Sequence, residues 1–385
     1  MNKIKILHII GAMNRGGAEV MLMDIYKNIS EDFHFDFLVN YKIKNGIIKG
    51  DFDDEILLKG AQIKYIPTQW DIGPRSYIKK IKEICTEIGM PEIVHIHMNA
   101  KSGIIALAAK KAGIKNVIVH SHADLKFRGG FVSRLASTLE LQFQKILISK
   151  YANYFWGCSN EANLSLFYKR LLIPKKATII NNAVDVKSFQ NVSNDEVIAL
   201  RKSYNINEKT IVLGNIGRIV SHKNVIFIID ILSQLHKENI DFVFVFAGRA
   251  DQEDYLEAIF NKAKKYDILN KIIYLGIRED VPVVVNSFDV FIAPALKEGF
   301  GLVAVEAQAV GLPCLLYTGF PKTVDMNLGL VTFFDTFDVK VWSDAVINSK
   351  EKYKNKEQLF EAIASKGFDI NSNTKQIEKL YKQMV

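Results

Sequence analysis

At 385 residues and 49% hydrophobic composition the chain is long enough for two domains with separate cores, and the absence of any run of about 18 apolar residues excludes a membrane-spanning helix. Its three cysteines, Cys85, Cys158 and Cys314, are scattered and form no C-x-x-C pair, which fits a reducing cytoplasm and argues against a zinc site or a disulfide scaffold. The formal charge of +8 comes from the first half, since residues 1–190 carry 27 Lys and Arg against 17 Asp and Glu, whereas residues 191–385 carry 23 against 25.

The chain opens with a predicted buried strand at Ile4–Ile10, a continuous apolar run that His8 interrupts and that is therefore a poor signal peptide. Gly16 and Gly17 lie in a turn after this strand, and a helix is predicted at Ala18–Ile29. Open α/β sheets bind ligands at such loops, so both glycines are candidate ligand contacts.

Strands are predicted next at Phe35–Asn40 and Ile63–Ile66, with an Asp-x-Asp pair, Asp51 and Asp53, between them. Two closely spaced aspartates can bind a divalent metal ion. This pair is not framed by strands, however, and continues into a predicted helix, so we expect no metal there.

Two histidines follow a later strand. A strand at Ile93–His97 precedes another at Val117–Val119, which ends in H-S-H-A-D with His120, His122 and Asp124. The carboxyl end of a strand is a functional position in such a sheet. The spacing is compatible with histidines that have a structural role and also with a set of metal ligands. No further cluster of ligands is evident in the sequence, which disfavours a metal site.

A long helix predicted at Arg128–Lys150 mixes apolar and basic residues. That mixture is compatible with contact at a membrane interface, and packing in the core is the alternative.

The second half begins after a predicted linker at residues 186–209, with an apolar strand at Ile211–Ile216. The loop that follows reads G-R-I-V-S-H-K-N and contains Arg218 and Lys223. Two cations beside a helix N-terminus can hold a diphosphate, whereas the alternative is that both are merely solvated.

The most informative stretch is residues 291–313, F-I-A-P-A-L-K-E-G-F-G-L-V-A-V-E-A-Q-A-V-G-L-P. A strand ends here, and Glu298, Phe300 and Gly301 open a helix that carries Glu306. Eight positions place the two glutamates along one helix face. Carboxylates only accept hydrogen bonds, so the pair suits a ligand rich in hydroxyls, such as a ribose and a hexose; the alternative is two solvated side chains.

These motifs together resemble a known family. The E-G-F-G-L-V-A-V-E segment looks like the EX7E signature of retaining glycosyltransferases of family four, which have the GT-B fold, and G-R-x-x-x-x-K-N is similar to their diphosphate clamp. The resemblance covers nearly the whole chain and is greatest for the bacterial capsular and exopolysaccharide branch. Where the family often shows Gly-Gly-x-x-Glu, this chain has Thr318–Lys322 with a different sequence, which leaves sugar or phosphate contacts there open.

The resemblance implies an α/β fold of two doubly wound, Rossmann-like domains facing a central cleft. Residues 1–190 would bind the acceptor and 191–365 the nucleotide sugar, with a C-terminal helix at 366–385 crossing back to the first domain.

The resemblance also implies roles for individual residues. A strand-end His contacts the donor sugar in the family; we choose His122, with His120 as the alternative. The implied catalytic residues are His122, Arg218, Lys223 and Glu298. The implied donor-binding residues are Gly16, Gly17, His120, Arg278 beside the base, Phe300, Gly301, Leu302 and Glu306, and no metal site is implied.

The expected activity is retaining transfer of a hexose or N-acetylhexosamine from a UDP-sugar to a lipid-linked saccharide acceptor, without a metal or other cofactor. A GT-B nucleotide-sugar epimerase and a non-catalytic nucleotide-sugar-binding partner of a synthesis complex are the alternatives. The basic first half indicates an anionic partner, either a membrane face or a phosphate-bearing acceptor. Nucleic acid is disfavoured because no binding motif accompanies the charge, and we expect a cytoplasmic protein, peripheral on the inner membrane face.

Overall fold

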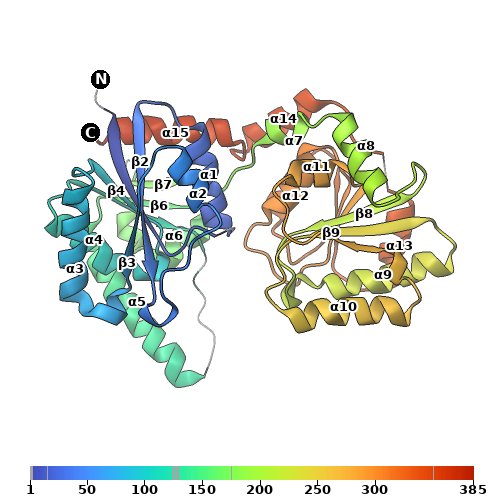
Figure 1. Cartoon of the computed structure of the whole chain (residues 1–385), viewed down its shortest axis with the longest axis horizontal. Coiled ribbons are helices and arrows are strands. Elements are labelled where there is room, and N and C mark those ends of the chain that lie inside the picture. The colour runs from blue at the N-terminus through green and yellow to red at the C-terminus, as the bar shows by residue number, and fades with distance from the viewer. Residues whose placement is uncertain (1–2, 15, 124, 126–129, 175, 350) are drawn as a thin grey trace. The chain divides into compact units, whose positions relative to one another are not determined.

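The protein divides into two compact units, one formed by Met1–Ala183 with Ile370–Val385 and the other by Val184–Asp369 (Figure 1). A computed structural model describes residues 3–14, 16–123, 125, 130–174, 176–349 and 351–385. Asp124 and Arg128, which entered the sequence predictions, lie outside these residues. No helix in the described ranges has both the length and the apolar character needed to cross a bilayer.

The first unit contains a seven-stranded parallel sheet in the order β3-β2-β1-β4-β5-β6-β7. Its strands are β1 (Ile4–Ile10), β2 (Phe33–Tyr41), β3 (Ile63–Pro67), β4 (Ile93–Ile96), β5 (Asn116–Ser121), β6 (Tyr154–Gly157) and β7 (Ala177–Ile179). Its helices are α1 (Gly17–Asn28), α2 (Asp53–Leu58), α3 (Gln69–Glu87), α4 (Ser102–Lys111), α5 (Phe131–Tyr151), α6 (Asn160–Leu166) and α15 (Ile370–Lys382).

The sheet of the first unit has an apolar core on each face, as strands buried on both sides require. Helices α1 and α15 pack beside each other, whereas α3, α4 and α5 form a separate packed set. The strand order reverses direction at β1 and β4, so this is the doubly wound topology that the alternating pattern predicted.

The C-terminal helix α15 belongs to the first unit, which confirms the predicted return of the chain. The Tyr381 ring is fully buried and stacks on Trp156 at a centroid distance of 5.6 Å. Lys382 Nζ lies 2.6 Å from a carboxylate oxygen of Asp32. The last residues of the chain therefore complete a core that begins at its first strand.

The second unit contains a six-stranded parallel sheet in the order β10-β9-β8-β11-β12-β13. Its strands are β8 (Ile211–Ile216), β9 (Phe242–Ala247), β10 (Ile272–Tyr274), β11 (Val290–Ala293), β12 (Cys314–Tyr317) and β13 (Val331–Phe334). Its helices are α7 (Val186–Gln190), α8 (Asn194–Ser203), α9 (Val225–Lys237), α10 (Glu253–Lys265), α11 (Val281–Asn286), α12 (Leu302–Ala309), α13 (Val339–Ile347) and α14 (Lys356–Ser365). The predicted α/β class with two doubly wound domains is confirmed.

The linker predicted at residues 186–209 is wrong, because this segment holds α7 and α8. Ser193 and Glu196 form a reciprocal capping box at the start of α8. Arg201 on α8 donates to the Ser287 carbonyl and to Asp289, which fastens the helix to the second unit. The second unit thus begins at Val184, somewhat before the boundary of 190 expected from the sequence.

Candidate active site

The loop between β11 and α12 contains the E-G-F-G motif. Gly301 precedes α12 with φ of 91°, a left-handed conformation, and a side chain there would overlap the Phe320 ring. Only glycine satisfies both conditions. Leu302 is the first residue of α12, and the first-turn N–H groups of a helix have no intrahelical acceptor, so they are suited to an anion.

Lys223 and Glu298, two of the predicted catalytic residues, form an ion pair between Nζ and Oε1. Their side chains are only 18% and 11% exposed, so both charges are largely removed from water. Leu296 N–H also donates to the His222 carbonyl at 2.9 Å, which holds the two loops together. Each charge depends on the other, because removing one partner of such a pair leaves an uncompensated charge.

The segment that departs from the family pattern supports this loop. Gly319 accepts a hydrogen bond from Glu298 N–H at 2.9 Å, and a side chain at Gly319 would overlap the Ala295 carbonyl. Phe320 lies beneath Gly301. Thr318–Lys322 therefore positions the E-G-F-G loop through its backbone and one aromatic ring.

Arg218 follows β8, but in this structure its guanidinium lies 3.2 Å from Asp251 rather than at the Lys223 pair. Asp251 also accepts from Arg249 at 2.7 Å, and the two arginines, Arg249 foremost, lower the pKa of its carboxyl. The loop is tight because Gly217 and Gly248 approach so closely that a side chain on Gly248 would overlap the Gly217 carbonyl. Arg218 is half exposed, so a bound anion can compete for it.

Arg278, the predicted base contact, forms a bidentate salt bridge with Asp280, at 2.7 Å from Nε and 2.5 Å from Nη2. The hydrogen bonds from Arg278 lower the pKa of the Asp280 carboxyl. The surface salt bridge weighed as the alternative is therefore present, and contact with a base stays a prediction.

Phe300 and Glu306 complete the set in the second unit. Phe300 stacks on Phe368 at a centroid distance of 4.5 Å, which fixes the ring at the end of the loop. Glu306 lies in the second turn of α12 and is half buried. Helix α12 begins at Leu302, so Glu298 lies in the loop before it, and the prediction that both glutamates lie on one helix face is wrong. The structure pairs Glu298 with Lys223 and places Glu306 in the second turn of α12.

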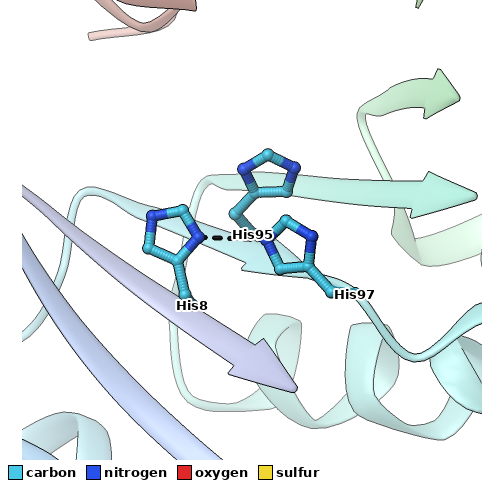
Figure 2. Close-up of side chains that lie close together, drawn as sticks. All are labelled: His8, His95 and His97. Atoms are coloured by element: carbon cyan, nitrogen blue, oxygen red, sulfur yellow. Dashed lines mark hydrogen bonds between the residues drawn. The ribbon is translucent and has the colours of Figure 1, made fainter. Parts of the chain in front are cut away.

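The first unit contains five histidines in adjacent positions, on and just beyond three neighbouring strands. Figure 2 shows three of them, His8 from β1 with His95 and His97 from and after β4. His120 is the last but one residue of β5, and His122 follows the strand directly. We call these five residues the histidine ladder.

Two hydrogen-bonded rows run through the histidine ladder. In one row His8 Nδ1 lies 3.0 Å from His97 Nε2, and His97 Nδ1 lies 2.8 Å from His122 Nε2. In the other, the Tyr381 hydroxyl lies 2.7 Å from His95 Nδ1, and His95 Nε2 lies 3.2 Å from His120 Nδ1.

Burial keeps the ladder uncharged. It lowers the pKa of His8 to about 3 and that of His122 to about 4, and it also lowers the pKa values of His95, His97 and His120. A neutral imidazole carries one N–H, so all bonds of the His8–His97–His122 row run in the same direction. If His8 donates, His122 presents an Nδ1–H donor; if His122 donates through Nε2, its Nδ1 is a bare acceptor.

The two candidate sugar contacts, His120 and His122, each have one buried ring nitrogen that no described residue bonds, Nε2 of His120 and Nδ1 of His122, and they differ in the burial of the whole side chain. The His120 ring is almost fully buried and lies parallel to His95, with centroids 5.3 Å apart. His122 is half buried, and its backbone N–H donates to Asn99 Oδ1 at 2.8 Å. No described residue forms a hydrogen bond with its ring nitrogen Nδ1.

Two triads within the ladder have nitrogen ligands within 4.8 Å of one another: His8, His95 and His97, and His97, His120 and His122. Imidazole suits zinc, copper and nickel. Most of their nitrogens are occupied by hydrogen bonds to each other, whereas Nε2 of His8, Nε2 of His120 and Nδ1 of His122 have no partner among the described residues. The geometry therefore describes a buried polar core as well as it describes a metal site.

Sequence reasoning missed His8, His95 and His97 as members of one cluster. The available signal was the repeat of H-x-H at residues 95–97 and 120–122, because a period of two directs both side chains of a strand to one face.

The remaining candidates have local structural roles. Gly16 is the N-cap of α1 and Gly17 its first residue. Asp53, from the Asp-x-Asp pair, accepts from Gly50 N–H at 2.9 Å and from the Tyr65 hydroxyl. Both bonds end on Oδ2 of the carboxylate.

Comparison with known proteins places this geometry in context. A family model described as "Glycosyl transferases group 1" matches residues 196–366, within the second unit. The putative glycosyltransferase EpsF of Bacillus subtilis is 29% identical over 98% of this chain and 96% of its own. The capsular polysaccharide biosynthesis glycosyltransferase CapH of Staphylococcus aureus is 24% identical over 98% of both chains. The Escherichia coli UDP-Gal:alpha-D-GlcNAc-diphosphoundecaprenol alpha-1,3-galactosyltransferase is 25% identical over 100% of this chain and 98% of its own.

Solved structures share the fold of the whole chain. Anabaena Alr3699/HepE in complex with UDP matches with a TM-score of 0.77 and 19% identity, covering 98% of this chain and 100% of its own. A glycosyltransferase from Rickettsia africae matches with a TM-score of 0.78 and 16% identity, covering 100% and 99%. These likenesses confirm the predicted GT-B fold.

Proposed function

We propose that this protein is a retaining glycosyltransferase of bacterial polysaccharide synthesis, because residues 196–366 match the family model described as "Glycosyl transferases group 1" and the relatives EpsF and CapH match over nearly the whole chain. Its donor is a UDP-linked hexose or N-acetylhexosamine, which is supported by the UDP and UDP-glucose named in the complexes of Alr3699/HepE. Its acceptor is a lipid-linked saccharide, as the printed name of the E. coli relative suggests by analogy. The reaction would occur at the inner face of the cell membrane.

The observation that carries this proposal is the Lys223–Glu298 ion pair beside the start of α12. Glu298 holds the Lys223 ammonium in a largely desolvated place, where electrostatic interactions are strong. Pre-organised cations near a helix N-terminus stabilise negative charge as it develops, at no further cost of reorganisation. Such an arrangement serves the departure of a diphosphate.

The proposed roles of the residues follow from this arrangement. Lys223 and Arg218 bind the diphosphate, with Arg218 exchanging Asp251 for the ligand. Glu306 accepts from the ribose, and Glu298 with the backbone of Phe300 and Gly301 contacts the sugar.

Four further residues complete the proposed donor contacts. Arg278 borders the base. From the first unit, His122 contacts the sugar, with Gly16 and Gly17 as donors to phosphate.

In the reaction the bond from the anomeric carbon to the leaving phosphate oxygen breaks, and the acceptor oxygen bonds to that carbon on the same face. The acceptor proton passes to the leaving phosphate, so neither a divalent cation nor a protein base is needed. The cations stabilise the transition state more than the ground state, because negative charge on the phosphate grows as the bond breaks.

The test is nucleotide release by the purified protein from a panel of UDP- and GDP-sugars, with a chelator present, with and without a membrane lipid extract from a polysaccharide-producing cell. We expect UDP release from one sugar, stimulated by the extract and unaffected by the chelator. UDP-sugar binding without release in any extract would instead support a non-catalytic binding protein. Abolition by the chelator would overturn metal independence.

A further inference from the structure

Helix α5 presents an apolar row to solvent. Leu135, Leu139, Phe143 and Ile146 are 50%, 63%, 53% and 56% exposed. Their spacing of four, four and three positions places them on one helix face. Single exposed apolar residues are ordinary, but a row of four large side chains along one helix indicates an interaction surface.

The opposite face of α5 holds the helix on the first unit. Leu141 and Ile148 are buried there, and Gln144 accepts from Ile104 N–H of α4 at 3.2 Å. Gly103 is required at this contact, since a side chain would overlap the Gln144 backbone and Leu147. Because α4 covers one apolar face, the exposed row is a second apolar face that folding of the unit does not use.

The part of the chain around α5 is strongly basic. Residues 101–183 carry 13 Lys and Arg against three Asp and Glu. Arg134 and Lys150 are exposed on α5, and Lys145 lies 5.8 Å from the centroid of the Tyr168 ring. An amphipathic helix with apolar residues on one face and basic residues beside them suits the boundary between anionic headgroups and acyl chains.

We propose that α5 docks on an anionic lipid surface, with Leu135, Leu139, Phe143 and Ile146 inserted at the headgroup boundary and the surrounding Lys and Arg near lipid phosphates. A second copy of this chain fits the surface less well, because two such faces would each bring the excess positive charge of residues 101–183. The inference does not depend on the transfer reaction, since docking requires neither donor nor acceptor.

The experiment is co-sedimentation of the full chain with vesicles of phosphatidylcholine alone or mixed with phosphatidylglycerol. The wild type should bind the mixed vesicles, with binding weakened by added salt, and should bind the neutral vesicles far less. The double variant Leu139→Glu with Phe143→Glu should bind mixed vesicles about tenfold less tightly or worse. Both side chains are exposed, so the melting temperature should stay close to that of the wild type.

The matched control is Leu57→Glu with Leu58→Glu on α2. These side chains are 54% and 87% exposed, but they follow the acidic residues Asp53, Asp54 and Glu55. This variant should bind vesicles like the wild type.

A third variant, Phe143→Trp, tests insertion rather than electrostatic adsorption: its emission should shift to the blue on mixed vesicles. Three outcomes overturn the proposal. The wild type does not bind mixed vesicles, or the two double variants lose vesicle binding equally. In the third, the wild type is a dimer in solution that the double variant Leu139→Glu with Phe143→Glu dissociates and the control variant does not.

Discussion

Among single residues, Lys223 is the one on which the proposed transfer depends most directly. Replacing it by Ala removes the cation nearest Glu298, so turnover should fall roughly 100- to 1,000-fold, the range seen when one pre-organised group is lost from a transition-state site. The matched control is Lys262→Ala, which breaks a 2.6 Å ion pair with Asp230 on other helices of the same unit. Steady-state rates of UDP release measure both variants.

Loss of stability is separated from loss of chemistry by a double variant. Lys223→Ala alone leaves a largely buried Glu298 charge without its partner and should lower the melting temperature. Adding Glu298→Ala removes that charge, so stability should recover while turnover stays low. If the double variant regains turnover, Lys223 has only a structural role.

Part of this residue-scale picture was accessible from sequence. The spacing of G-R-x-x-x-x-K-N and of Glu298 and Glu306 predicted the residues, but the pairing of Lys223 with Glu298 joins positions 75 apart in the chain. Such a contact depends on β8 lying next to β11, which no local pattern encodes. The same applies to Arg218, whose partner Asp251 follows β9.

At the scale of elements, the histidine ladder joins β1, β4 and β5 and makes the first unit sensitive to acid. Its histidines have pKa values lowered in the folded state, to about 4 for His122, against 6.5 when exposed. The unfolded chain therefore binds more protons than the folded chain between these values. The free energy of unfolding should fall as pH falls from 6.5 toward 4, by about 1.4 kcal/mol per pH unit for each such histidine.

Chemical denaturation at several pH values measures this slope. His8→Phe removes one group and keeps an aromatic ring beside Phe35, so its slope should be shallower than that of the wild type. A wild-type stability that does not change between pH 7 and pH 5 would contradict the buried neutral ladder.

Prediction of the elements succeeded where a pattern was local and failed where it was not. Continuous apolar runs predicted the central strands, because strands buried on both faces admit few polar residues. Helix α8 was missed, since it has no fully buried residue and is rich in charge, although Ser193 and Glu196 carried a readable capping-box signal. The ladder was missed because His8 looks like a lone core histidine until the strand order is known.

At the scale of the whole molecule, the C-terminal helix α15 packs in the same unit as the N-terminal strand β1. Tyr381 is nearly fully buried against Trp156 and Phe33, so Tyr381→Ala should destabilise that unit by about 3–5 kcal/mol. Tyr381→Phe keeps the ring and loses only the bond to His95, at a cost of about 1 kcal/mol.

Hydrogen exchange followed by peptide measures these losses. Protection should fall in β4 and β6 of the alanine variant and stay unchanged in β8 and β11 of the second unit. Equal loss in both units would show that α15 stabilises the chain as one cooperative body instead.

The two-unit architecture was predicted from the alternation of strands and helices, which requires parallel sheets covered on both faces. The return of α15 came from the family resemblance rather than from any local signal, since its residues specify an amphipathic helix but not its partner.

Transfer of labelled sugar tests the proposed transferase activity directly. Purified protein is incubated with a labelled UDP-sugar, a chelator and membrane lipid extract, and the lipid product is analysed by mass spectrometry and by NMR of its anomeric proton. We predict a lipid-linked saccharide extended by one sugar, with the anomeric configuration of the donor, formed by the wild type and nearly absent with Lys223→Ala. A product of inverted configuration would contradict the retaining mechanism, and conversion of the UDP-sugar to an isomer without transfer would contradict the transferase itself.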